Sequence, residues 1–331
     1  MKILLTLDYE LFLGEKTGSV ENCLIKPLSE YLSVLDKYNA KFTIFVDATY
    51  LYMLKFYAEQ YDSAKNDYDK IVNHIKDLQG KGHDIQLHIH PHWFFSKYDG
   101  NEWMLDSNHY KLCDLEVEDA LKIFIESKEL LDGIIRKKTI AFRAGGFSTQ
   151  PTELLTKLFQ SGGIKIDSSV CPGNYYDSPQ QKYDYLNAPN EDIYRFGDDI
   201  CSISQEGKFI EVPITTHKVS PLFYWRVVLN KFIKSDKHRL YGDGCAVKTT
   251  SESIIERLTK FTSGMATIDG FKIKCLNNAY EECKRKGKDV LCIIGHPKLT
   301  TKYSVAKLDR FCRGMKEEHN EFVTISYFYE D

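Results

Sequence analysis

Short apolar runs of strand length alternate along the chain with stretches whose apolar residues recur at helical spacing. The runs that predict strands are residues 2–8, 41–48, 83–90, 139–146 and 164–170. The stretches that predict helices are residues 24–39, 68–82, 115–135 and 151–163. Strands that alternate with helices indicate parallel strands joined by helical connections. The pattern therefore predicts an α/β fold built on a parallel sheet.

The second half of the chain is less regular. Residues 171–245 form a tyrosine-rich stretch that we interpret as an irregular insertion. Further elements are predicted as strands at 208–216 and 289–298 and as helices at 223–235, 252–262 and 274–287. Because no repeat, linker or low-complexity segment interrupts the chain, we expect residues 1–331 to form a single domain.

Polar side chains gather where the predicted strands end. They are Asp8 with Glu10, Asp47, the histidines from His88 to His92, Arg143 and Asp167. The carboxyl ends of parallel strands lie on the same face of a barrel or an open sheet, and that face carries the chemistry in such folds. We therefore expect these side chains to converge on one pocket.

Four of the ten histidines of the chain fall within "GHDIQLHIHPHW", residues 82–93. His88, His90 and His92 alternate at the end of a predicted strand, so they can share one side of it. Neutral imidazole is a common ligand of zinc and related metals, and two imidazoles with one carboxylate form a familiar metal site. The alternative is a set of hydrogen-bonded structural histidines. Three alternating histidines at a strand end favour metal binding.

The carboxylates for such a site are present at the end of the first predicted strand. Asp8 and Glu10 in "LTLDYELF" are two residues apart and lean to the same side. One of them can hold a metal while the other acts as a base toward water. The spacing alone leaves open which carboxylate has which role.

The composition argues against a nucleic-acid-binding protein, a membrane-spanning protein and a secreted protein. The formal net charge is −3, which gives no strong attraction to nucleic acid, and no apolar segment is long enough to span a bilayer. The nine cysteines are scattered without a C-x-x-C pair, and the N-terminus has no signal-peptide cleavage pattern. We therefore expect free thiols and a cytoplasmic protein.

Several motifs together resemble the polysaccharide deacetylase family, carbohydrate esterase family 4. They are "TLDYE", "GHDIQLHIHPH", "AFRAGG", "KIDSSV" and "IIGHP", which occur in the family's order from residue 1 to about residue 298. The resemblance implies a distorted (β/α) barrel, a divalent metal that is usually zinc, and hydrolysis of the acetamide of N-acetylated sugars.

The resemblance also implies roles for individual residues. His88 and His92 match the two metal-binding histidines of the family, and His90 falls on the position between them. Asp8 matches the catalytic base and Glu10, in an Asp-x-Glu pattern, the third metal ligand. The remaining matches are Arg143 as the partner of the base, Asp167 as the support of that arginine, and His296 as the general acid.

These motifs suggest a metal-dependent N-deacetylase that acts on a sugar or saccharide, in capsule, O-antigen or other cell-surface glycan assembly. A deformylase or another linear amide hydrolase on the same fold is the first alternative, because the hydrolytic residues would be the same. A non-catalytic saccharide-binding protein is the second. The oligomeric state is not predicted by the sequence.

Overall fold

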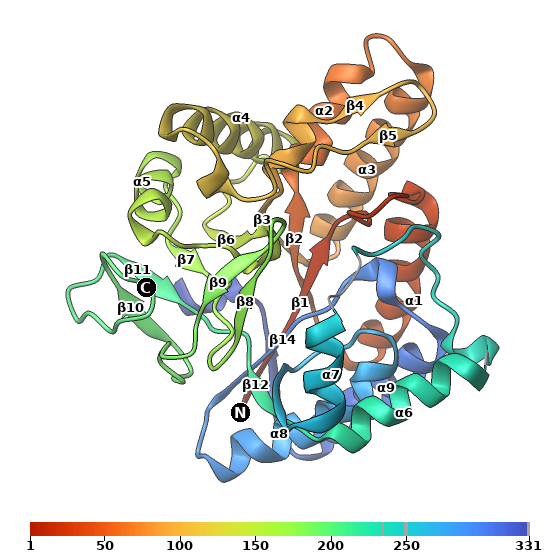
Figure 1. Ribbon diagram of the computed structural model, residues 1–331, viewed down its shortest axis with the longest axis vertical. Coiled ribbons are helices and arrows are strands. Elements are labelled where there is room, and N and C mark those ends of the chain that lie inside the picture. The colour runs from red at the N-terminus through yellow and green to blue at the C-terminus, as the bar shows by residue number, and fades with distance from the viewer. Residues whose placement is uncertain (234, 248–250, 330–331) are drawn as a thin grey trace. The chain divides into compact units, whose positions relative to one another are not determined.

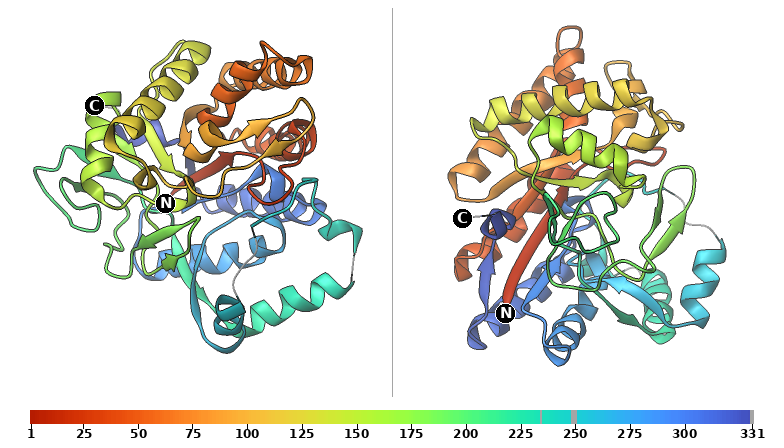
Figure 2. Two further views of the ribbon diagram at one scale, coloured as in Figure 1. Left: turned by 45° about the horizontal axis from the view of Figure 1, so that its top comes forward. Right: turned by 90° about the vertical axis from the view of Figure 1, so that its left-hand side faces the viewer.

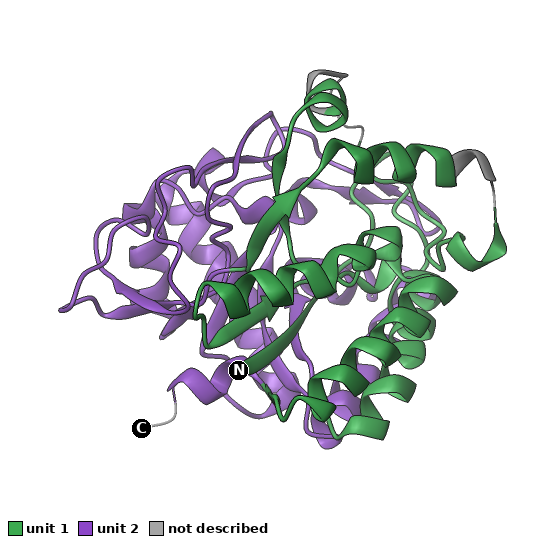
Figure 3. Ribbon diagram, turned by 90° about the horizontal axis from the view of Figure 1, so that it is seen from below, with its two compact units in different colours: residues 1–41, 214–323 green, residues 42–213, 324–331 purple. Residues whose placement is uncertain are grey.

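The computed structural model describes residues 1–233, 235–247 and 251–329. The chain forms two compact units (Figure 3). Unit 1 contains Met1–Lys41 and Ile214–Val323, and unit 2 contains Phe42–Pro213 together with the C-terminal residues from Thr324 onward.

Unit 2 is built on parallel strands in the order β2-β3-β6-β7-β11, with β10 antiparallel at the end of the row. The bounds of the strands are β2 (Thr43–Asp47), β3 (Asp84–Ile89), β6 (Ala141–Ala144), β7 (Ile166–Asp167), β10 (Tyr194–Phe196) and β11 (Phe209–Glu211). The register pairs Asp47 with His88 and His88 with Arg143. Paired residues of neighbouring parallel strands point to the same face, so these three polar side chains form one row across the sheet.

Helices connect the strands of unit 2, as the alternating pattern predicts (Figure 1). They are α2 (Ala48–Tyr57), α3 (Asp62–Gly80), α4 (Val117–Ile135) and α5 (Thr152–Gly162). Helices α2, α3 and α4 pack against β3, and α5 packs against α4. Two short antiparallel pairs complete the unit, β4 (Lys97–Tyr98) with β5 (Trp103–Met104) and β8 (Tyr175–Asp177) with β9 (Lys182–Asp184).

Unit 1 is centred on β1 (Lys2–Tyr9), which runs parallel to β14 (Val290–Ile293) on one side and to β15 (Glu321–Val323) on the other. Its helices are α1 (Lys26–Leu35), α6 (Pro221–Ile233), α7 (Ser251–Thr259), α8 (Leu276–Arg285) and α9 (Lys302–Glu317). Strands β12 (Thr216–Val219) and β13 (Thr262–Met265) form an antiparallel pair beside α8. β1 is buried along nearly its whole length, which explains its continuous apolar sequence.

The predicted strands and helices are confirmed as elements, with shifted ends. The clearest shortening is at residues 164–170, where only Ile166–Asp167 are strand. The strand ends there because Ser168 and Ser169 bond with their side chains to Arg143, Ala144 and Asp167. Helix α2 was not predicted, because its sequence is apolar on several sides and lacks a helical period.

The insertion expected at residues 171–245 contains β8 to β12 and α6. No helix in the described part of the chain combines the length and the apolar character that a bilayer-spanning segment needs.

Candidate functional site

His88 lies near the end of β3, buried between its register partners on β2 and β6. Its Nδ1 atom is 2.7 Å from the backbone carbonyl oxygen of Arg143. A carbonyl oxygen only accepts hydrogen bonds, so Nδ1 of His88 carries the proton and Nε2 carries the lone pair. This is the usual way in which a protein orients an imidazole to bind a metal through its other nitrogen.

His90 follows β3 directly and is held through its backbone. Its amide donates to Oγ1 of Thr49 at 3.0 Å, and that oxygen lies 2.9 Å from the carbonyl oxygen of His90. The rings of His88 and His90 meet edge to face with centroids 4.7 Å apart. One ring nitrogen of each lies within 4.8 Å of the other, close enough for both to bind a single ion.

His92 has a different environment from the other two histidines. It lies in the short helix η3 (Pro91–Phe95), fully buried, with its ring stacked on Tyr110 at a centroid distance of 4.6 Å and tilted against Trp93 at 5.0 Å. The His90 and His92 rings are 5.6 Å apart. The structure thus places all three predicted histidines together, with His92 in contact with two aromatic rings.

Asp47 accepts hydrogen bonds that hold the segment carrying these histidines. Its Oδ2 accepts a hydrogen bond from the indole Nε1 of Trp93 at 2.7 Å. Its Oδ1 accepts from the hydroxyl of Thr49 at 2.5 Å and from the amide of Tyr50, which makes Asp47 the N-cap of α2. Both oxygens are engaged with the scaffold, so Asp47 positions the histidine segment.

Gly145, the first glycine of the "AFRAGG" motif, lies against the end of β3. A Cβ atom at this position would lie 2.5 Å from the carbonyl oxygen of Ile89 and 2.6 Å from Nδ1 of His90. Both contacts are far below van der Waals distance, so the chain after β6 can lie against His90 only where residue 145 has no side chain.

Arg143 is fully buried on β6, in the same row as Asp47 and His88. Its Nε and Nη2 atoms donate to the carbonyl oxygen and to the hydroxyl of Ser168 at 2.7 and 2.9 Å. The guanidinium carbon lies 4.3 Å from the ring centroid of Phe45. These contacts fix the planar guanidinium in a single orientation.

Asp167 is also completely buried and accepts hydrogen bonds from the amide and the hydroxyl of Ser169 at 2.8 and 3.0 Å. Burial raises the pKa of Asp167 to about 6, although a hydrogen bond with Glu211 and the charge of Arg143 act in the opposite direction. Asp167 and Glu211 are register partners on β7 and β11. The predicted supporting residue therefore belongs to a buried acidic pair beside the arginine.

The raised pKa of Asp167 predicts a pH-dependent stability. The folded state binds the proton more tightly than the unfolded state, so this stabilisation is complete below pH 4 and is lost as the pH rises through about 6. We expect the free energy of unfolding of the wild type to fall by about 2 kcal/mol more than that of Asp167→Asn between pH 4.5 and 7.5. Urea unfolding at both pH values measures the difference. The exposed Asp177→Asn is the control, and equal pH dependence in wild type and Asp167→Asn would contradict the expectation.

Unit 1 carries three further residues that the sequence singles out, at the ends of two of its strands. Asp8 and Glu10 are buried at the end of β1, and His296 follows β14, the parallel neighbour of β1. The Nε2 atom of His296 is 3.7 Å from Oδ2 of Asp8 and 3.6 Å from Oε1 of Glu10. The structure therefore brings these three predicted residues together.

Asp269 orients His296 through the ring nitrogen that is farther from Asp8 and Glu10. Its two carboxylate oxygens accept from the backbone amide and from Nδ1 of His296 at 2.8 and 2.9 Å. Burial alone would lower the pKa of His296, but the charges of Asp269, Asp8 and Glu10 outweigh it and hold the pKa above its usual value. The imidazole thus favours its protonated form, as a general acid requires.

Lys298, like Asp269, was not predicted from the sequence as part of the site. Its buried ammonium donates to Oε1 of Glu10 at 2.9 Å and to the carbonyl oxygen of Leu11 at 2.6 Å. Lys298 lies two residues after His296, so its position could have been noted. The pairing with Glu10, 288 residues away in the sequence, depends on the fold.

Removing Lys298 should destabilise the metal-free protein. A buried carboxylate that loses its partner costs about 3–5 kcal/mol, because the remaining charge stays desolvated. We expect Lys298→Met to lower the free energy of unfolding by this amount in the presence of a chelator, as measured by urea denaturation. The exposed Lys302→Met on α9 is the matched control. A loss no larger than that of Lys302→Met would show that the pair does not stabilise unit 1.

Comparisons with known proteins support the fold. Neither a protein-family model nor a curated protein matches the sequence. The structure is similar to a solved protein of Mycobacterium smegmatis assigned to the polysaccharide deacetylases, with a TM-score of 0.53 and 15% identity over 98% of this chain and 86% of that one. This likeness confirms the predicted fold class, a curled parallel sheet with helices of the distorted (β/α) barrel type.

Two further solved structures were found at lower similarity. PuuE allantoinase has a TM-score of 0.49 and 12% identity, and a Pseudomonas aeruginosa protein assigned to the polysaccharide deacetylases has 0.48 and 13%. Each covers 98% of this chain, and the chain covers 87% of each of them.

Proposed function

We propose that the chain is a metal-dependent hydrolase that removes the N-acetyl group from a sugar or saccharide. The observation that carries the proposal is the chemistry at the carboxyl ends of parallel strands. β3 ends in buried imidazoles, one of them with a fixed tautomer, and β1 and β14 end in two buried carboxylates beside a third imidazole. In α/β folds the catalytic residues lie at these strand ends.

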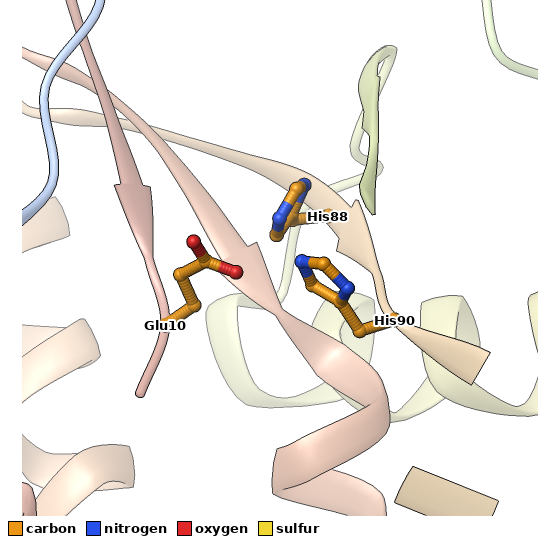
Figure 4. A group of neighbouring side chains, drawn as sticks. All are labelled: Glu10, His88 and His90. Carbon is orange, nitrogen blue, oxygen red and sulfur yellow. The ribbon is translucent and has the colours of Figure 1, made fainter. Parts of the chain in front are cut away.

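The residues that would hold a divalent metal are Glu10, His88 and His90, each of which can offer one ligand atom (Figure 4). Glu10 follows β1, His88 lies on β3, and His90 comes just after it. The donor set fits the metal, because one carboxylate and two neutral imidazoles are the ligands that zinc takes in hydrolases. His92, which the family resemblance implies as a ligand, is the alternative to His90.

A bound zinc ion would supply Lewis-acid activation of water and of the amide carbonyl. Asp8 takes the proton from the attacking water, and His296 gives a proton to the departing nitrogen. Asp269 keeps His296 oriented and charged for that transfer. Arg143, held by Ser168 and accompanied by Asp167, is proposed as the partner of the base.

The substrate class proposed is an N-acetylated saccharide of capsule, O-antigen or cell-surface glycan assembly, with the two units acting as one catalytic domain. We further propose that the protein works in the cytoplasm. All nine cysteines, which lie in the described residues, are free thiols, as expected in a reducing compartment.

Product analysis tests the reaction. Purified protein loaded with zinc is incubated with N-acetyl and N-formyl forms of the same amino sugars, free and nucleotide-linked, and the released acid is measured. Acetate release that requires the metal supports the proposal. Formate release alone would transfer the assignment to a deformylase, and metal binding without release of either acid would favour a saccharide-binding protein.

A further inference from the structure

Helix α6 turns an apolar stripe toward solvent. Leu222, Trp225 and Leu229 are 59%, 50% and 58% exposed, whereas Phe223 in the same turn is buried. Residues spaced by three and four positions share one face of a helix. The outward face of α6 therefore carries an apolar stripe, although helices at a protein surface normally present polar residues to water.

Helix α7 packs beside α6 (Figures 1 and 2). The indole Nε1 of Trp225 donates to the carbonyl oxygen of Leu258 at 3.1 Å, which ties the exposed face of α6 to the end of α7. Ile255 on α7 and Phe261 just after it are 61% and 60% exposed. We call these exposed residues the apolar patch: Leu222, Trp225, Leu229, Ile255 and Phe261.

The stretch of sequence that contains the apolar patch differs in charge from the chain as a whole. Residues 218–262 contain nine Lys or Arg and four Asp or Glu, a net charge of +5, although the whole chain carries −3. Arg226 and Lys260 are exposed next to the patch, and the ammonium of Lys218 lies 4.6 Å from the ring centroid of Phe261. A binding partner that fits this surface therefore has both an apolar region and negatively charged groups.

We propose that the apolar patch docks the protein on the surface of an anionic lipid bilayer, with α6 lying in the plane of the interface. Amphipathic helices bind this way when Leu, Trp or Phe enter the boundary of the acyl chains and Lys or Arg meet the lipid phosphates. Trp225 at the middle of the stripe fits the interfacial layer, where indole rings are enriched. The inference does not depend on the proposed hydrolase activity, because none of the candidate site residues lies in 218–262.

Vesicle flotation of the full chain tests the inference. Wild type is mixed with vesicles of phosphatidylcholine alone and of phosphatidylcholine with phosphatidylglycerol, at low and high salt. We expect binding to the anionic vesicles that is at least about tenfold stronger than to the neutral ones and that weakens with salt. Leu222→Ser/Leu229→Ser should lose binding by about tenfold or more, because two apolar side chains no longer enter the bilayer.

A matched variant tests whether the loss of binding is specific to the apolar patch or follows from removing any exposed apolar side chains. Leu186 and Ile203 in unit 2 are 57% and 52% exposed, so Leu186→Ser/Ile203→Ser removes a similar apolar area and should bind like wild type. Circular dichroism and thermal melting confirm that both double variants are folded. Equal binding of wild type to both kinds of vesicle, or equal binding of the two double variants, would overturn the proposal. So would a dimer in sedimentation velocity that dissociates only in Leu222→Ser/Leu229→Ser, because the patch would then join two copies of the chain.

Discussion

The His88→Ala variant is expected to lose metal binding. His88 is the imidazole whose tautomer is fixed by the carbonyl of Arg143, so its Nε2 lone pair is already oriented for an ion. Changes to groups that only support a ligand weaken metal affinity about 10- to 100-fold, so loss of a ligand itself should exceed about 100-fold. Competition with a chromophoric chelator measures the zinc affinity of wild type and variant.

Single variants of the two remaining histidines decide the ligand set. If Glu10, His88 and His90 hold the metal, His90→Ala should match His88→Ala, whereas His92→Ala should retain affinity within about tenfold and lose stability instead. The stability loss follows from the packing of His92 against Tyr110 and Trp93. A His92→Ala variant that loses the metal while His90→Ala keeps it would assign the site to the pair implied by the family resemblance.

The control for these variants is the exposed His319. Its backbone φ is +58°, a left-handed conformation that Asn tolerates better than Ala, so the control is His319→Asn. It should bind zinc like wild type. Unchanged affinity in all three variants, His88→Ala, His90→Ala and His92→Ala, would contradict a metal site at the end of β3.

Asp8→Asn should abolish most of the catalytic rate while leaving the metal in place. The substitution preserves the shape of the side chain but removes the base, and a positioned base contributes about 10²- to 10⁴-fold to the rate. We expect kcat/KM for amide hydrolysis to fall by this factor. Zinc affinity measured on the same preparation should stay within about tenfold of wild type, since Glu10 and not Asp8 is the proposed ligand.

His296→Asn is expected to give a loss of similar size, because the departing nitrogen no longer receives a proton. The surface variant Asp309→Asn on α9 is the isosteric control and should keep full activity. An Asp8→Asn protein that loses its zinc would reverse the roles of Asp8 and Glu10. An Asp8→Asn protein with wild-type turnover would contradict the proposed chemistry.

The sequence predicted the fold well because its strands are buried. Short, mainly apolar runs such as 2–8 and 41–48 can only be strands or short buried helices, and the polar residues at their ends mark where each strand ends. Residues 164–170 were overestimated as a strand, since the serine side chains that end β7 do so through contacts with Arg143 and Asp167. Such contacts depend on tertiary packing and leave no periodic signal.

The sequence predicted most residues of the candidate site, but it predicted only some of the contacts between them. The histidine cluster and the Asp-x-Glu pair are visible because residues with metal-binding chemistry recur at short spacing. Lys298 and Asp269 were not predicted, because their partners Glu10 and His296 are distant in sequence. The stacking of His92 on Tyr110 was not predicted either, so the sequence did not distinguish the environment of His92 from that of His90.

A carboxylate and two imidazoles of this chain are proposed to hold one divalent metal. Elemental analysis of purified wild type and of Glu10→Gln/His88→Ala, each after zinc loading and gel filtration, tests it most directly. We predict about one zinc ion per chain in wild type and less than about a tenth of that in the double variant. The absence of zinc from both proteins, or its presence in equal amounts in both, would contradict the metal site and the hydrolase mechanism that depends on it.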